Sequence, residues 1–142
     1  MNIQEIEGEI ILEFASFEDW LDKYNHIIES ARNIPRIEPK YKEEKFLIQG
    51  CQSQVWLRAD LEDGKVIFTA DSDALITRGI IALLIRVLSN QPPQDIIDAK
   101  LEFIEKTGLH QHLSPTRSNG LASMVKQMKL YAIAFKAQTE AQ

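Results

Sequence analysis

The sequence predicts an α+β fold, in which a small antiparallel sheet of about three strands packs against helices. All segments with strand character follow one another near the middle of the chain, and helical segments lie on both sides of them. This order argues against the alternating strands and helices of a parallel sheet. A length of 142 residues with 44% hydrophobic residues suits one core. We therefore expect a single domain over residues 1–142.

Two helices are predicted before the sheet. Isoleucines recur at three- and four-residue spacing within residues 2–13, which is the pattern of a short amphipathic helix. Apolar residues recur at the same spacing over residues 17–31 and predict a second helix. Ser16 is a candidate N-cap for this second helix, and Pro35 ends it.

Three strands are predicted in the middle of the chain. Residues 46–48 form a short apolar segment after a polar loop. Apolar and polar residues then alternate over residues 55–61 and again over residues 66–70, as in half-buried strands. The segment Glu62-Asp63-Gly64 between them has the composition of a tight turn. The last two strands therefore form an antiparallel hairpin.

Helices and one polar loop are predicted for the rest of the chain. Residues 74–89 are apolar almost all round, which is typical of a central buried helix. Residues 95–107 suit one or two short helices, and residues 109–120 read as a polar loop. The last amphipathic helix begins near residue 121, with Ser118 as its candidate N-cap.

Composition excludes several classes of function. The chain carries 16 basic and 21 acidic residues, a poor balance for nonspecific nucleic-acid binding. Its one cysteine excludes an intramolecular disulfide and a metal site of three or four cysteines within the chain. The acidic first ten residues do not resemble a secretory signal, and no apolar run is long enough to span a membrane. We therefore expect a soluble cytoplasmic protein whose thiol stays reduced.

Cys51 is the residue most informative about chemistry. It follows Gly50 and precedes three polar residues, so we place it on a loop between two predicted strands. An inert structural cysteine normally lies within a periodic apolar segment, which is absent here. The position therefore favours a reactive thiol, with a buried inert cysteine as the alternative.

Other catalytic and metal-binding patterns are weak. Cysteine hydrolases need a histidine base, and no histidine lies near Cys51 in the sequence. Phosphate-binding loops rich in glycine, HExxH and CxxC motifs are absent. By ligand type alone, a metal site is conceivable, and its ligands would be Cys51, His110, His112 and Asp71 or Asp73. Residues of these types that are scattered along a chain occur commonly by chance, so this combination is weak support for a metal site.

The segment around Cys51 resembles the signature of a known family. The run Gly50-Cys51-Gln52-Ser53-Gln54-Val55-Trp56 is similar to that of the SufE family, sulfur acceptors for cysteine desulfurases. Further segments resemble the family in the same order, namely residues 71–74 with 79–82, residues 91–96 and residues 111–120. The resemblance extends from about Ile48 to the last helix.

This resemblance implies both a fold and a role. The fold would be that of the NifU/IscU-type scaffold proteins. The Cys51 thiolate would attack the terminal sulfur of a persulfide on a SufS-like cysteine desulfurase and stimulate that enzyme. Cys51 would then pass the sulfur to an iron–sulfur cluster assembly scaffold. The resemblance implies no cofactor and no metal, and the composition leads us to expect neither a nucleic acid nor a membrane as partner. It leaves open whether this sulfurtransferase-like accessory protein is itself an enzyme.

The resemblance also suggests supporting residues. Gly50 would allow the tight loop, and Gln52, Ser53 and Gln54 could hydrogen-bond the loop backbone or the persulfide. The carboxylates of Asp71 and Asp73 would cap the central helix or hold the cysteine loop. His112 and Arg117 would dock the desulfurase or contact Cys51, and the alternative for both is a solvated loop.

Two other functions stay open for the chain. It could be a regulatory binding module for a desulfurase, with Cys51 incidental, or a metal or iron–sulfur scaffold. For the carrier, we expect the Cys51 side chain to be largely covered in the free protein, near the hairpin and the central helix, because an exposed persulfide loses sulfur to any thiol.

Overall fold

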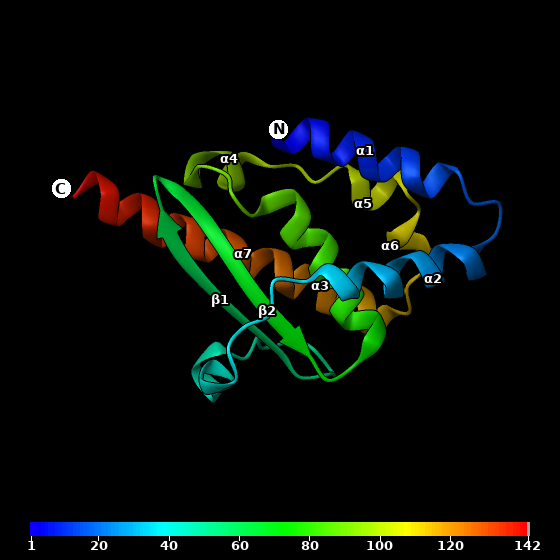
Figure 1. Ribbon diagram of the computed structural model, residues 1–142, viewed down its shortest axis with the longest axis horizontal. Coiled ribbons are helices and arrows are strands. Elements are labelled where there is room, and N and C mark those ends of the chain that lie inside the picture. Colours follow the sequence, from blue (N-terminus) through cyan, green and yellow to red (C-terminus); the bar gives the residue numbers. More distant parts are fainter. Residues whose placement is uncertain (142) are drawn as a thin grey trace.

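A computed structural model describes residues 1–141 and shows helices packed against one β-hairpin (Figure 1). The helices are α1 (Ile3–Ala15), α2 (Trp20–Ser30), α3 (Leu75–Leu88), α4 (Pro93–Asp98), α5 (Phe103–Lys106), α6 (Leu109–His112) and α7 (Pro115–Glu140), and the strands are β1 (Val55–Glu62) and β2 (Lys65–Ser72). Short 3₁₀ turns occupy Ala31–Asn33, Pro39–Tyr41 and Glu44–Phe46. The α+β class predicted from the sequence is confirmed.

The hairpin is the predicted one. Strands β1 and β2 pair antiparallel over their full length, from Val55 opposite Ser72 to Glu62 opposite Lys65. Asp63 and Gly64 form the turn with φ values of 51° and 78°, as a two-residue turn of the favoured twist requires. One face of the hairpin is buried against the helices.

Helix α3 forms the centre of the core. It contacts α1, α2, β2 and α7, and ten of its fourteen residues are buried. Its Gly79 lies against α2, where an added Cβ would come within 2.1 Å of the Ile27 carbonyl oxygen. Only a hydrogen atom fits at this position, and the two helices therefore pack closely.

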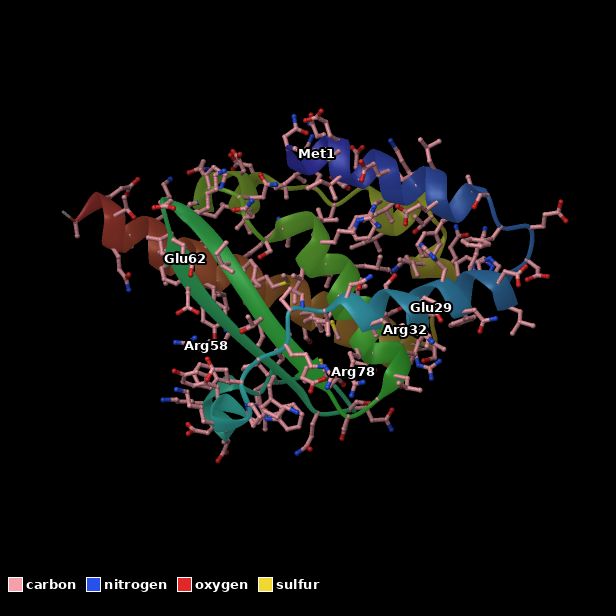
Figure 2. The ribbon with its side chains drawn as sticks, viewed as in Figure 1. Met1, Glu29, Arg32, Arg58, Glu62 and Arg78 are labelled. Atoms are coloured by element: carbon pink, nitrogen blue, oxygen red, sulfur yellow. The ribbon has the colours of Figure 1, made fainter. Side chains whose placement is uncertain are left out.

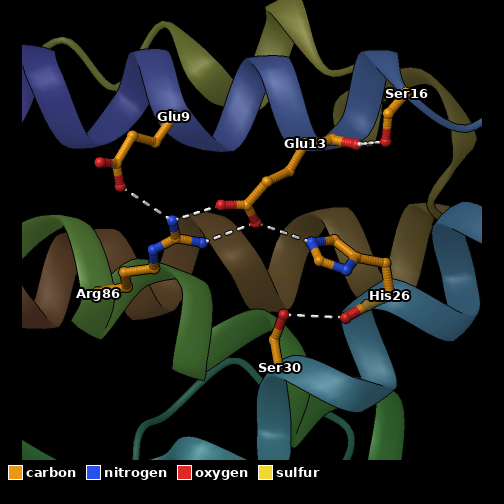
Figure 3. Close-up of polar contacts among 6 residues, drawn as sticks. All are labelled: Glu9, Glu13, Ser16, His26, Ser30 and Arg86. Carbon is orange, nitrogen blue, oxygen red and sulfur yellow. Dashed lines mark hydrogen bonds and ion pairs between the residues drawn. The ribbon is translucent and has the colours of Figure 1, made fainter.

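A polar network joins α1, α2 and α3 at the surface (Figure 3). The Arg86 guanidinium donates to Glu13 at 2.9 Å and to Glu9 at 3.2 Å, and His26 Nε2 lies 3.0 Å from the same Glu13 carboxylate. The hydrogen bond from Arg86 is the largest influence on the pKa of Glu13, which is lowered. These partly exposed pairs orient the helices more than they stabilise the fold.

The structure corrects three details near element ends. Residues 46–48 form no strand: Leu47 makes only an isolated bridge with Trp56, which leaves a sheet of two strands in the described part of the chain. Helix α2 is capped by Asp19 rather than Ser16. Helix α7 begins at Pro115 with Ser114 as its cap, not at Ser118, because proline is well suited to the first position of a helix.

The predicted polar loop over residues 109–120 is consequently helical for most of its length, first as α6 and then as the start of α7. Among the helices that the structure describes, none is long and apolar enough to span a membrane.

Candidate functional site

Cys51 lies in a small pocket between three parts of the fold. Its loop precedes β1 and follows Gly50, whose φ of 91° lets the backbone turn sharply. The pocket has a volume of about 110 Å³ and lies between the cysteine loop, the start of α3 and the first turns of α7. Gln52 and Ser53 line it together with the half-buried Cys51.

The cysteine loop rests directly against α7. Cys51 Sγ donates to the Gly120 carbonyl oxygen at 3.6 Å, and a Cβ on Gly120 would lie 3.6 Å from this sulfur. On Gly50, an added Cβ would come within 2.4 Å of Ser123 Oγ. Burial raises the pKa of the Cys51 thiol. The thiol is therefore mainly neutral at pH 7 and is partly covered by α7.

The other end of the loop is held by the segment that joins β2 to α3. The Gln54 amide donates to Asp73 Oδ1 at 3.1 Å, and Ser72 Oγ donates to the Gln54 carbonyl oxygen at 2.8 Å. The expectation that Asp71 or Asp73 caps α3 is wrong, because Ala74 is the N-cap and no carboxylate accepts from the first amides of the helix. The Ala74 amide itself donates to Ser72 Oγ at 3.3 Å. Asp73 was expected either to cap α3 or to hold the cysteine loop, and its bond with the Gln54 amide does the second.

Asp71 is buried beneath the end of the hairpin and forms two ion pairs. Lys42 Nζ lies 2.7 Å and Arg78 Nε 2.8 Å from its carboxylate oxygens, and the Ser72 amide donates to it at 2.8 Å. Figure 2 shows Arg78 beside the end of β2. Burial alone would raise the pKa of Asp71, but the hydrogen bonds from Lys42 and Ser72 and the charge of Arg78 outweigh it and lower this pKa.

His112 and Arg117 lie in different surroundings. Arg117 is exposed and lines the pocket of Cys51, while its amide donates to the capping Ser114. The His112 ring stacks on Trp20 of α2, with ring centroids 3.9 Å apart, and His112 is not among the residues that line the pocket. The structure therefore brings Arg117, but not His112, to the pocket.

The cover of Cys51 differs from the sequence-based expectation. The side chain is half-buried rather than largely covered. Its pocket is lined by α3, the central helix of the expectation, and by α7, while no hairpin residue is among those that line it. A metal site has no support in the described residues, which contain no group of three or more histidine, cysteine or acidic side chains that could hold an ion.

Sequence reasoning did not single out several residues of the site. Thr77 and Met124 line the pocket, Gly120 accepts from the thiol, and Lys42 and Arg78 neutralise Asp71. Two of these residues could have been noticed in the sequence, because Thr77 and Arg78 are polar residues within the otherwise apolar segment of α3.

Comparison with known proteins gives consistent matches. The family model described as "SufE: Fe-S metabolism associated domain" matches residues 8–132. An uncharacterized SufE-like protein of Synechocystis sp. is 39% identical over 132 residues, which are 91% of this chain and 81% of that protein. One from Rhizobium meliloti is 39% identical over 85% of this chain and 90% of its own length.

A longer relative and a solved structure extend these matches. SufE-like protein 1, chloroplastic/mitochondrial, of Arabidopsis thaliana is 35% identical over 93% of this chain, but the match covers 36% of that protein. The solution structure of a hypothetical protein from Thermus thermophilus has a TM-score of 0.76 at 23% identity, over 94% of this chain and 96% of the other. This structural likeness concerns the fold.

Proposed function

Because the chain belongs to the SufE family, whose domain is associated with Fe–S metabolism, we propose that it accepts sulfur from a cysteine desulfurase on Cys51. The observation that carries the proposal is the placement of this thiol, the only cysteine of the chain, in a pocket with room for another atom. The protein then stimulates the desulfurase and passes the sulfur to an iron–sulfur cluster assembly scaffold in the cytoplasm.

The transfer is an exchange between thiol and persulfide. The Cys51 thiolate attacks the terminal sulfur of the persulfide on the desulfurase cysteine and forms a new S–S bond. The S–S bond of the donor breaks, and its electron pair leaves with the desulfurase cysteine as a thiolate. The reaction has no net oxidation or reduction, and it needs no histidine base once Cys51 is deprotonated.

The surroundings of Cys51 suggest when this attack becomes possible. The thiol is neutral in its pocket, because burial raises its pKa. Docking of the desulfurase must expose the sulfur and allow its proton to leave before the thiolate can attack. We expect the desulfurase to dock over the mouth of the pocket, where Arg117 and Gln52 are exposed. His112 does not line the pocket, so any part that it plays in docking would depend on its stacking contact with Trp20 of α2.

The supporting residues hold the loop that must move. Gly50 provides the turn before Cys51, and Asp73 and Ser72 hold Gln54 after it. Asp71, with its two cationic partners, fixes the end of the hairpin from which these contacts come. These residues define one resting position of Cys51.

Intact mass after incubation with a cysteine desulfurase and free cysteine tests the proposal. We expect a gain of about 32 Da that reductant reverses and that is absent from Cys51→Ser. The matched activity assay should show stimulation by the wild type and none by the variant. Stimulation without added mass would instead support a regulatory binding module. Metal bound to the purified protein would support a scaffold.

A further inference from the structure

The wall of the pocket formed by α3 presents amides without a capping side chain. Helix α3 spans 14 residues, and no capping side chain accepts a hydrogen bond from its first amides. The only side-chain bond at its N-cap in the described chain is that from the Ala74 amide to Ser72 Oγ, at 3.3 Å. The first amides of a helix have no acceptor within the helix. Those of Ile76 and Thr77 belong to residues that line the pocket of Cys51. At the start of α7, by contrast, Ser114 accepts from the Arg117 amide at 3.3 Å.

Thr77 adds an unpartnered hydroxyl to the same wall. The residue is 8% exposed and lines the pocket, yet its hydroxyl has no hydrogen-bond partner within the described chain. Thr107, which follows α5, and Thr139 within α7 each donate to the carbonyl four residues before. No fully buried polar side-chain atom of the described residues lacks a partner. The Thr77 oxygen is therefore not fully buried, and its residue borders the open space of the pocket.

This wall suits an anion rather than a neutral group. The start of a helix carries a partial positive charge, and free amides and a hydroxyl donate hydrogen bonds. Arg117 adds a full positive charge at the pocket. The resting thiol does not use these groups, because Cys51 Sγ donates to Gly120 on the opposite side, on α7.

A persulfide on Cys51 would place an anion in this space. A persulfide is a stronger acid than its parent thiol, so its terminal sulfur carries the negative charge near neutral pH. An S–S bond of about 2.05 Å carries that sulfur beyond Sγ. The pocket volume of about 110 Å³ is several times the roughly 10–15 Å³ that one water molecule needs. The terminal sulfur therefore fits without displacing either helix.

We propose that the first turn of α3, with Thr77 as its positioning residue and Arg117 at the edge, holds the terminal sulfur of the Cys51 persulfide. The inference rests on the proposed function and adds a distinction between two states of the protein. The empty thiol bonds α7, and the loaded persulfide bonds α3. Loading thus strengthens closure of the pocket and slows the loss of sulfur to other thiols.

Chemical loading tests the subsite without the desulfurase. Inorganic tetrasulfide transfers one sulfur atom to the Cys51 thiolate, giving the persulfide anion and trisulfide. After its removal, dithiothreitol reduces the persulfide to the thiolate and hydrogen sulfide and becomes a cyclic disulfide. Intact mass follows the loss of the added sulfur over time in the wild type, Thr77→Val, Thr77→Ser and the control Thr139→Val, which removes an exposed hydroxyl of α7.

We expect Thr77→Val to lose sulfur about tenfold faster than the wild type, the effect of one lost hydrogen bond to a charged group. Thr77→Ser and Thr139→Val should match the wild type, and alkylation of the empty thiol should be equal in all four proteins. Equal loss of sulfur from Thr77→Val and the wild type overturns the subsite, as does a wild type that retains no sulfur after loading.

The desulfurase assay separates this inference from the function on which it rests. Normal loading of Thr77→Val by the desulfurase, with an unchanged persulfide lifetime, would leave the carrier function intact and remove the subsite. The opposite result would be a persulfide that forms with tetrasulfide and has a lifetime that depends on Thr77, in a protein that the desulfurase does not load. That result would support the subsite and contradict the carrier function.

Discussion

Replacing Gly120 by alanine tests whether the cysteine loop rests on α7 as described. The added Cβ would lie 3.6 Å from Cys51 Sγ, which is an ordinary van der Waals contact. Alanine is favoured over glycine inside a helix by about 0.8–1.0 kcal/mol. Burial of one methyl group adds about 0.8 kcal/mol. We therefore expect Gly120→Ala to raise the free energy of unfolding by about 1–2 kcal/mol and to slow alkylation of Cys51 severalfold, because the methyl group narrows the pocket.

Gly8→Ala is the matched control for this substitution. Gly8 lies inside α1, and a Cβ there would meet no atom within 4 Å. The free energy of unfolding of Gly8→Ala should rise by about 1 kcal/mol because of the higher helix propensity of alanine, and the rate of Cys51 alkylation should not change. Urea denaturation gives both stabilities, and mass spectrometry after timed iodoacetamide treatment gives the alkylation rates. Alkylation of Gly120→Ala at the wild-type rate, or destabilisation of this variant alone, would refute the described contact between loop and helix.

Three further outcomes follow from the contacts of the site and the core. Burial raises the pKa of Cys51, so the pH profile of alkylation should have its midpoint higher in the folded protein than in urea. The stability linked to this group is full below the unfolded pKa of about 8.5 and is lost as pH rises through the folded pKa; coincident profiles would contradict this. Asp73→Ala frees the Gln54 amide and should speed alkylation of Cys51 severalfold, measured by mass against wild type, and an unchanged rate would show that this contact does not hold the loop. Gly79→Ala should cost about 2 kcal/mol or more in urea denaturation, despite its better helix propensity, because its Cβ would meet the Ile27 carbonyl; a stabilised variant would exclude this close packing.

Local sequence signals predicted the elements whose burial is visible in the spacing of their apolar residues. The alternation of β1 and β2 and the Asp63-Gly64 turn fixed the hairpin register, and the all-round apolar α3 predicted the core. Residues 46–48 failed as a strand because three apolar residues cannot distinguish a strand from a 3₁₀ turn followed by a single bridge. The start of α7 was missed because its exposed first turns are polar, although Ser114 followed by Pro115 is a typical helix start.

Only part of the site could be predicted in the same way. Cys51 and Gly50 were identified because loop chemistry is visible in the residues around them. Periodicity gives no information about which distant helix covers a loop, so the contact with Gly120, 69 residues away, could not be predicted. The stacking of the exposed His112 ring on Trp20 could not be predicted either, and the docking role that the resemblance suggests for His112 stays a prediction. A contact between two aromatic rings across 92 positions leaves no mark in either local pattern.

The contacts around Cys51 limit how the loop can present its sulfur. Gly50 before it lies against Ser123, and Gln54 after it is held through both its amide and its carbonyl. The residues between them have no such backbone hydrogen bonds to the rest of the protein in the described structure. A partner that draws out only this short segment would expose the thiol while the hairpin and α3 stay in place. Exposure also removes the burial that raises the pKa of Cys51. One movement would therefore give access and raise the fraction of thiolate, and the loop can stay protected until a partner docks.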